Sequence, residues 1–333
     1  MRRIAIVGAT GLVGREIIRL CESYFDPDTE YILYASEKSQ GSKIKVNNTE
    51  LTIKLLSKNN IEEVDLAMFS AGGERSKEFA KDFINKGSYV VDNSSAFRSE
   101  EDIPLVVYGV NEGVISKTDK LIANPNCTTM ILVMALKPMH NVYQLEKIVP
   151  VSYQAVSGSG LEATESLIEE NILGEELNAD YLEGYYGRPI ANNVIPLAGD
   201  MLDNGYSEEE MKFLTESRKI LEVPSLIVEP SNARVGVKTG HGIFCSATFI
   251  KDVDLNQIIK SIDAFPGIEH WADKLPTPLD AEGSENVYIS RIRKGLSSDK
   301  IINFWVVGDN LLKGAALNTV QIAEKLIKDY YAK

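Results

Sequence analysis

Short apolar runs alternate with amphipathic segments through the first third of the chain. The first run, residues 2–8, is followed over residues 11–24 by apolar side chains at the spacing of one helix face. Four more runs are typical of buried strands: 31–36, 64–70, 88–94 and 120–124. An amphipathic helix is predicted between the middle two, over residues 73–87. Strands and helices that alternate in this way predict a largely parallel, doubly wound sheet.

Glycines mark the turn between the first strand and the first helix. Such glycines let the chain turn sharply, let a pyrophosphate approach the backbone and let the helix pack on the strand, with the helix N-terminus facing the phosphates. The spacing is GxxGxxG rather than the common GxGxxG, but its position between strand and helix favours a dinucleotide site. The candidate cofactor residues here are Gly8, Thr10, Gly11, Leu12, Val13 and Gly14.

The end of the next strand bears on which dinucleotide is bound. An NAD-binding domain usually offers a carboxylate there to hold the ribose hydroxyls. In this chain Ser36, Lys38 and Ser39 dominate that position, which favours a 2′-phosphate and hence NADP. Glu37 lies among them and leaves the use of NAD open.

Composition and charge narrow the class of protein. The chain has 333 residues, 44% of them hydrophobic, which is average for a globular protein and long enough for two domains. No apolar run reaches the length of about 18 residues that a membrane helix needs, and the N-terminus lacks the features of a signal peptide. We therefore expect a cytoplasmic protein without a membrane partner. The net charge of −13 also opposes binding to nucleic acid.

Cysteine and histidine provide the candidate chemistry. The three cysteines are isolated, without a CxxC pair, so neither a disulfide framework nor a metal site is predicted. Cys127, in the stretch NPNCTT, follows a predicted strand and precedes a predicted helix over residues 128–139. A thiol at a helix N-terminus feels the positive end of the helix dipole, which favours the nucleophilic thiolate. The Asn126 side chain and the Cys127 amide could donate hydrogen bonds to a developing oxyanion.

The bases that would serve this thiol are less well marked. Of the three histidines, His140 follows the predicted helix and His270 lies in a turn-like segment. His241 lies seven residues after Arg234, so the two can share a site only if the chain bends between them, at its glycines. The residues alone favour His241 only weakly over the other two histidines as the base for Cys127.

Taken in order, these segments resemble the aspartate-semialdehyde dehydrogenase family, nearly end to end. The resemblance rests on an ordered set of motifs: GATGLVG (8–14), ASEKSQG (35–41), SAGG (70–73), DNSSAFR (92–98), NPNCTT (124–129), SYQAVSGSG (152–160), EEMK (209–212) and RVGVKTGH (234–241). It implies that Cys127 is the nucleophile, that His241 is the general acid/base and that Gln154 orients the substrate carbonyl or thioester.

The same resemblance implies the binding residues. Arg234 would clamp the substrate α-carboxylate with its planar fork, and Glu209 would hold the amino group. Arg98 and Lys212 would bind inorganic phosphate or the acyl phosphate. The further cofactor contacts that it implies are Ser36, Ser39, Ser70, Gly72, Ser157, Gly158, Gly160 and Asn310.

The reaction implied is the NADP-dependent reductive dephosphorylation of L-4-aspartyl phosphate to L-aspartate 4-semialdehyde, in lysine, threonine and methionine biosynthesis. The Cys127 thiolate attacks the acyl phosphate, inorganic phosphate leaves, and NADPH reduces the thioester. Such a reaction needs a soft nucleophile, an oxyanion donor, a proton carrier, cationic phosphate ligands and a dry pocket.

The resemblance also implies the architecture, which is α/β and glyceraldehyde-3-phosphate-dehydrogenase-like. A Rossmann-type NADP-binding domain would span residues 1–128. A catalytic and dimerisation domain with a mostly antiparallel sheet would span 129–311, with a helical insertion at about 161–220. A helix over 312–333 would return to pack on the NADP-binding domain, and the protein would be a homodimer.

Three other functions are compatible with parts of the pattern. N-acetyl-γ-glutamyl-phosphate reductase shares the fold and the thiol chemistry, but it typically carries a glycine where this chain has Asn126. Its substrate lacks a free amino group, so Glu209 together with Arg234 favours the aspartyl substrate. A non-catalytic NADP-binding paralogue would not need Cys127 and His241 together. A thiol hydrolase would need both but no nicotinamide cofactor.

Overall fold

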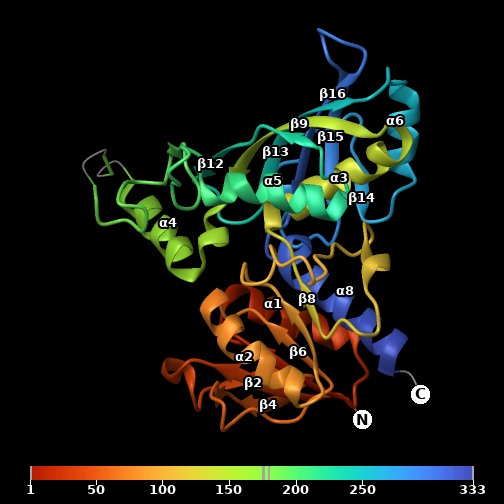
Figure 1. Cartoon of the computed structure of the whole chain (residues 1–333). Helices are drawn as coiled ribbons and strands as arrows, with labels where there is room; N and C mark the ends of the chain where they lie inside the picture. The colour runs from red at the N-terminus through yellow and green to blue at the C-terminus, as the bar shows by residue number, and fades with distance from the viewer. Residues whose placement is uncertain (1, 175–176, 179–180, 332–333) are drawn as a thin grey trace. The chain divides into compact units, whose positions relative to one another are not determined.

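The computed structural model describes residues 2–174, 177–178 and 181–331, and it divides into two compact units (Figure 1). The first unit is made of the chain up to Asn126 and from Ala315 onward, and the second is Cys127–Gly314. Residues 175–176 and 179–180 of the predicted insertion, and 332–333 of the predicted last helix, lie outside the described residues.

The first unit is built on a six-stranded sheet in the order β5-β2-β1-β6-β7-β8. Every neighbouring pair is parallel, as the alternation of strands and helices predicts. Its strands are β1 Arg3–Val7, β2 Glu30–Ala35, β5 Lys54–Leu55, β6 Leu66–Phe69, β7 Tyr89–Asp92 and β8 Leu121–Ala123. A separate antiparallel hairpin, β3 Lys43–Val46 with β4 Thr49–Thr52, was not predicted from the sequence.

Both faces of this sheet are covered by helices. On one face Ala5 and Val7 of β1 pack in a cluster with Phe79 and Phe83 of α2 (Gly73–Asn85). Successive side chains of a strand point to opposite faces, and Ile4 and Ile6 are also fully buried. Two helices that pack on one another and on the sheet complete the unit: α1 Leu12–Tyr24 and α8 Leu317–Leu326. Burial on both faces explains why these strands read as continuous apolar runs.

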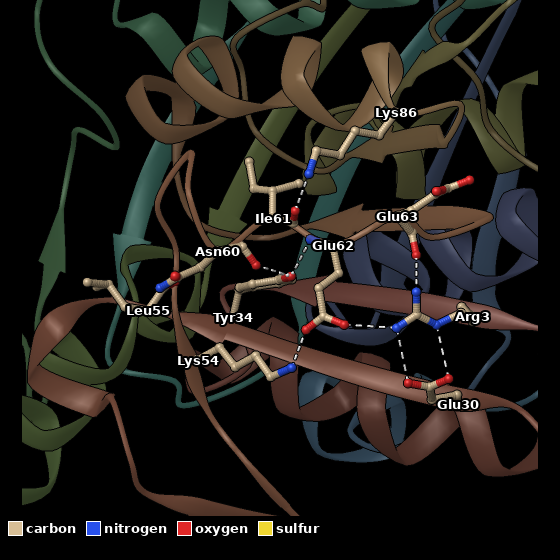
Figure 2. A network of polar contacts seen from close by, with 10 residues as sticks. All are labelled: Arg3, Glu30, Tyr34, Lys54, Leu55, Asn60, Ile61, Glu62, Glu63 and Lys86. Carbon is tan, nitrogen blue, oxygen red and sulfur yellow. Dashed lines mark hydrogen bonds and ion pairs between the residues drawn. The ribbon is translucent and has the colours of Figure 1, made fainter.

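The amino ends of the strands are joined by a polar network (Figure 2). Arg3, the first residue of β1, donates through Nε and Nη2 to the Glu30 carboxylate, at 3.0 and 3.2 Å. Its Nη2 also donates to Glu62, at 2.9 Å, and its Nη1 to the carbonyl of Glu63. Lys54 of β5 pairs with the other Glu62 oxygen. The start of this parallel sheet is therefore held by partnered charges.

The second unit has an eight-stranded sheet in the order β10-β12-β9-β13-β16-β15-β14, with β11 beside β9. Its central pairs, β9 with β13, β13 with β16 and β16 with β15, are antiparallel. The strands are β9 Leu145–Gln154, β10 Val194–Ile195, β11 Ile227–Val228, β12 Ser231–Val235, β13 His241–Phe249, β14 Ile268–His270, β15 Val287–Lys294 and β16 Ile301–Gly308. His270 ends a strand rather than lying in a turn, and its Nδ1 is 3.0 Å from the Asp263 carboxylate.

One face of this sheet carries α3 (Cys127–Tyr143), which packs between α5 (Glu208–Leu221) and α6 (Leu255–Asp263) (Figure 1). The residues from Thr128 to Leu136 are all buried, because the helix has neighbours on every side. Two more helices belong to the unit: α4 Leu161–Leu173 and α7 Pro278–Ala281. The other face of the sheet carries the ring cluster of Tyr153, Phe244 and Trp305, and Tyr153 is 36% exposed.

The last helical segment belongs to the first unit from Ala315 onward. It is not one α-helix: a π-helical turn at Leu312–Ala316 precedes α8, and another at Ile327–Tyr331 follows it. The buried Asn318 side chain donates to the carbonyl of Val106 and to the Asn124 side chain, and it accepts from the amide of Tyr108. Across the described part of the chain, every helix is too short or too polar to cross a lipid bilayer.

Candidate functional site

In the sheet of the first unit, β2 lies on one side of β1 and β6 on the other, so the order in which successive strands are added reverses at β1. Loops at the carboxyl ends of such strands enclose a crevice in which ligands bind. Gly8, directly after β1, has φ +91°, and a Cβ there would lie 2.3 Å from the Ser70 carbonyl oxygen. Only glycine allows this approach, which brings the loops after β1 and β6 together.

A groove of about 230 Å³ opens at this point. Its walls are Gly8, Thr10, Gly11, Ala35, Ser36, Leu56, Ser70, Ala71 and Arg75. α1 starts here at its N-cap Gly11, and among the described residues no side chain caps it and no acid lies in its first turn. Amides at the positive end of a helix favour phosphate, so the groove fits one end of a dinucleotide.

Five of the predicted cofactor residues line this groove: Gly8, Thr10, Gly11, Ser36 and Ser70. Ser39 lies beside it, with its hydroxyl 3.5 Å from that of Thr10. Gly14 has a packing role, because a Cβ there would lie 2.1 Å from the Gly8 carbonyl oxygen. Leu12 and Val13 are the first two residues of α1, and Gly72 is the N-cap of α2.

Cys127 is the first residue of α3, so its thiol lies at the positive end of a well-buried helix. It is partly exposed, whereas Cys21 and Cys245 are buried. Burial raises the pKa of both buried thiols, which makes them inert at neutral pH. Gly314 leaves room for the Cys127 side chain, since a Cβ at that glycine would lie 2.9 Å from the Cys127 Cβ.

The peptide groups of Ala155 hold two of the predicted side chains at once. The amide of Ala155 donates to Nδ1 of His241, at 2.9 Å, and its carbonyl accepts from Nη1 of Arg234, at 2.8 Å. Arg234 lies in β12, whereas His241 begins β13, and Gly240 between them has φ +95°. The bend that the shared site requires is therefore present.

The hydrogen bond from Ala155 fixes the tautomer of His241. A backbone amide can only donate, so Nδ1 is unprotonated and the neutral ring carries its proton on Nε2. Burial, and next the positive charge of Arg234, lower the pKa of His241 well below its usual range. The imidazole is thus held neutral. Its Nε2 is buried and finds no hydrogen-bond partner among the described residues.

Arg234 is 5% exposed, and it too has a buried hydrogen-bond donor without a partner among the described residues. Its Nε makes no hydrogen bond within the described part of the chain, and the Tyr186 ring lies 5.9 Å from the guanidinium carbon. A Cβ added at Gly158 would lie 3.2 Å from both Arg234 Nη1 and His241 Nε2. The glycine therefore leaves free the space that the two side chains share. A buried cation and a buried N–H donor around that space fit an anionic ligand.

Two other predicted residues support this region. Gln154, 1% exposed, pairs with Arg234 in the register of β9 and β12, and its side chain donates to the Ser152 hydroxyl. Asn310 donates to the Ser157 hydroxyl at 2.9 Å and accepts from the amide of Gly240 at 2.8 Å. Asn310 thereby ties the turn before His241 to the loop of Ser157 and Gly158. Gly160, with φ +100°, is the N-cap of α4.

The remaining substrate candidates lie apart in the chain. Glu209 and Lys212 form an ion pair with one another on α5. Arg98 belongs to the first unit, where its Nε donates to the carbonyl of Asn124 and its Nη2 to that of Asn93. Asn126 is the last residue of the first unit and directly precedes Cys127.

The sequence did not reveal two residues that shape these regions. Glu170, 1% exposed, accepts from the amides of Ile190 and Ala191 at 2.6 and 2.8 Å, which anchors the chain that leads into β10 beside Arg234. In the run SLIEEN it resembles an ordinary surface acid of a helix, so no signal marks it. Arg75 lines the nucleotide groove, and its place just after the SAGG loop was the available clue.

Comparison with known proteins matches both units. The family model for the semialdehyde dehydrogenase NAD binding domain matches residues 3–118, and that for the semialdehyde dehydrogenase dimerisation domain matches 136–313. The chain is 40% identical to the aspartate-semialdehyde dehydrogenase of Bacillus subtilis, over 98% of this chain and 97% of that one. The crystal structure of aspartate semialdehyde dehydrogenase II from Vibrio cholerae superposes with a TM-score of 0.94 at 37% identity, covering 99% of both chains. A structure of aspartate semialdehyde dehydrogenase II complexed with ASA, from the same organism, gives 0.92 at 36%, also over 99% of both.

Proposed function

Because the chain belongs to the aspartate-semialdehyde dehydrogenase family, we propose that it forms L-aspartate 4-semialdehyde from L-4-aspartyl phosphate with NADPH, and runs the reverse reaction with inorganic phosphate. The observation that carries this proposal is the arrangement around Ala155, which holds a neutral His241 and a buried Arg234 at one space. The comparisons do not support the alternatives, N-acetyl-γ-glutamyl-phosphate reductase included, because the relatives compared are aspartate-semialdehyde dehydrogenases.

The roles follow from the chemistry of each group. The Cys127 thiolate attacks the acyl carbon, the carbon–oxygen bond to phosphate breaks, and a thioester forms on Sγ. Nε2–H of His241 donates a hydrogen bond to the oxyanion that develops at this carbon, and after hydride transfer the thiohemiacetal oxyanion collapses to the aldehyde as the C–S bond breaks and the Cys127 thiolate leaves. Arg234 binds the α-carboxylate, and Gln154 orients the acyl oxygen. Bound NADPH supplies the hydride.

The polar pair on α5 gives two further roles. The Glu209 carboxylate would accept from the substrate ammonium group, while Lys212 and Arg98 bind phosphate. Glu209 and Lys212 form an ion pair with one another, so the charge of each is balanced within the protein. On arrival of substrate the ammonium and phosphate groups replace the internal partners.

The cofactor assignment is supported by the groove of the first unit. It combines the glycine loop, the uncapped N-terminus of α1 and Ser36 at the end of β2. Ser36 occupies the position at which NAD-binding domains usually carry a carboxylate, so the 2′-phosphate of NADP meets no negative charge from that residue.

We further propose a homodimer. The second unit matches a dimerisation domain. The sheet face opposite α3 carries the rings of Tyr153, Phe244 and Trp305, with Tyr153 36% exposed. Aromatic side chains gathered on an open sheet face are typical of protein–protein interfaces.

The test follows NADPH absorbance as the protein is given L-aspartate 4-semialdehyde and NADP, with and without inorganic phosphate. We expect NADPH to form only with phosphate, and Cys127→Ala to lower the rate by at least about 10⁴-fold. Cys21→Ala is the matched control, because the buried Cys21 thiol has no part in the reaction. Equal rates for Cys127→Ala and the wild type would refute the thioester, and turnover without phosphate would remove the acyl-phosphate step. Faster turnover of N-acetyl-glutamate semialdehyde would transfer the assignment to the rival reductase.

A further inference from the structure

The nucleotide groove of the first unit contains a cation that the glycine motif does not account for. Arg75 is the third residue of α2, the helix that follows β6, and its side chain forms part of the groove wall. The opposite side of the groove is formed by Ala35 and Ser36 at the end of β2. Since β1 lies between β2 and β6, Arg75 and Ser36 flank the same crevice from two sides.

Arg75 is the charged member of this wall. The other described lining residues are glycines, small hydroxyl residues, alanines and Leu56, so the charge in the groove is the guanidinium. Within residues 2–174, 177–178 and 181–331 it makes no hydrogen bond or ion pair, unlike Arg3 and Arg98 in the same unit. An arginine in a groove wall whose N–H donors have no protein partner can bind an anion with all of them.

The neighbouring residues indicate which part of the nucleotide this anion is. The N-terminus of α1 provides for the pyrophosphate. Ala35, Leu56 and Ala71 form apolar walls, which suit the flat faces of an adenine ring. The ribose between adenine and pyrophosphate then meets the end of β2, where Ser36 stands. A 2′-phosphate on that ribose points to Ser36 and to the cation across from it.

We propose that Arg75 is the residue that selects NADP over NAD, by pairing its guanidinium with the 2′-phosphate while Ser36 contributes its hydroxyl. This inference rests on the proposed function, because it assumes that the groove binds the adenosine end of the cofactor. Lys38, two residues after Ser36, is exposed and is not among the residues that line the groove. Selection therefore depends on Arg75 rather than on the nearer lysine in the sequence.

The experiment measures binding to the full-length protein by titration calorimetry, with adenosine 2′,5′-bisphosphate and adenosine 5′-monophosphate as probes. The two nucleotides differ only in the 2′-phosphate. For Arg75→Met we expect the Kd of the bisphosphate to rise about 10- to 100-fold, the cost of losing a hydrogen-bonded charge, while the Kd of the monophosphate changes less than about twofold. Arg75→Lys keeps the positive charge but lacks the planar guanidinium, so its Kd for the bisphosphate should lie between those of the wild type and Arg75→Met.

Lys77→Met is the matched control, since Lys77 is exposed on the same helix and does not line the groove. It should leave both constants unchanged. If Arg75→Met lost affinity equally for both nucleotides, the arginine would contact a part that they share, such as adenine. If it lost affinity for neither, the arginine would have no role in binding. Either result overturns the inference. If the wild-type protein catalyses phosphate-dependent NADPH formation while Arg75→Met binds like wild type, the selection role alone fails. If the wild type neither binds these nucleotides nor turns over, the proposed function fails with it.

Discussion

Two arginines of this protein, Arg3 and Arg234, are held in opposite ways. Arg3 is about one-third exposed, and its guanidinium is satisfied by two carboxylates and a carbonyl. Arg234 is almost fully buried, has one backbone acceptor, and its Nε finds no partner among the described residues. Burial without full pairing costs free energy, so it persists where a ligand supplies the missing partner. The comparison thus distinguishes Arg3, whose charge links neighbouring strands, from Arg234, whose charge is available to bind an anionic ligand.

Among the changes that test this comparison of the two arginines, the largest effect should come from removing Arg234. Arg234→Met takes away the partner of the substrate carboxylate, and we expect kcat/KM for L-aspartate 4-semialdehyde to fall about 10²- to 10³-fold. Steady-state kinetics would measure this, with thermal unfolding as the check on folding. Arg234→Lys should recover only part of the loss, because an ammonium group lacks the planar fork. A variant as active as the wild type would remove Arg234 from the site.

Filling the space beside Arg234 should have a smaller effect. A methyl group at Gly158 would lie 3.2 Å from both Arg234 Nη1 and His241 Nε2, so each must shift by a few tenths of an ångström. We expect Gly158→Ala to lower kcat/KM about tenfold, since small misplacement of reacting groups is costly. Gly113→Ala, at a glycine with nothing near its Cβ position, is the control. Similar kinetics for both variants would show that the space does not hold substrate.

The charge of Arg234 should also be visible in the titration of His241. With three histidines in the chain, imidazole NMR signals can be assigned by single substitutions. We expect the pKa of His241 to lie well below 6.5 in the wild type, and to rise toward that value, without reaching it, in Arg234→Met, because burial is the larger cause. A signal that titrates near 6.5 in both proteins would contradict the buried, neutral imidazole.

The sign of the linked stability follows from the same pKa. The unfolded chain takes up a proton at His241 near pH 6.5, before the native protein does. This residue therefore contributes its full stability above about pH 6.5 and loses it progressively as the pH falls below that value. Denaturant unfolding of His241→Asn should show a weaker loss of stability over the same acidic range.

The smallest effect should come from the satisfied arginine. Arg3→Met removes a network of partly exposed ion pairs, each of which contributes little, and we expect a loss of about 1 kcal/mol in the free energy of unfolding. Urea unfolding would measure it. kcat/KM should stay unchanged, so a catalytic defect in Arg3→Met would weaken the contrast between the two arginines.

The sequence predicted the first unit well because each strand there is buried on both faces. The five apolar runs correspond to β1, β2, β6, β7 and β8, and the helices 11–24 and 73–87 to α1 and α2. The hairpin of β3 and β4 was missed because its exposed positions carry lysine, glutamate and threonine rather than a strand pattern. Pro138 did not end α3, because tertiary packing on every side outweighs the local preference.

The candidate site was less predictable from pattern than from ordered motifs. Periodicity alone could not bring Arg234 and His241 together; the positive φ of Gly240 and the shared contact with Ala155 do so. The role of Glu170 depends on a carboxylate turned inward from α4 onto a distant loop, and no local feature of the sequence encodes that direction.

The close contact of Gly314 with Cys127 has a consequence for the chain's connectivity. These residues are the last and first of the second unit, so that unit enters and leaves at one place. In the first unit the flanking segments also meet, since the Asn124 side chain lies 3.4 Å from the Ala315 carbonyl oxygen. The second unit is thus a domain insertion, the kind of segment that can be excised or permuted without opening the host. A short peptide that joins residue 126 to 315 would make the nucleotide-binding unit one continuous chain.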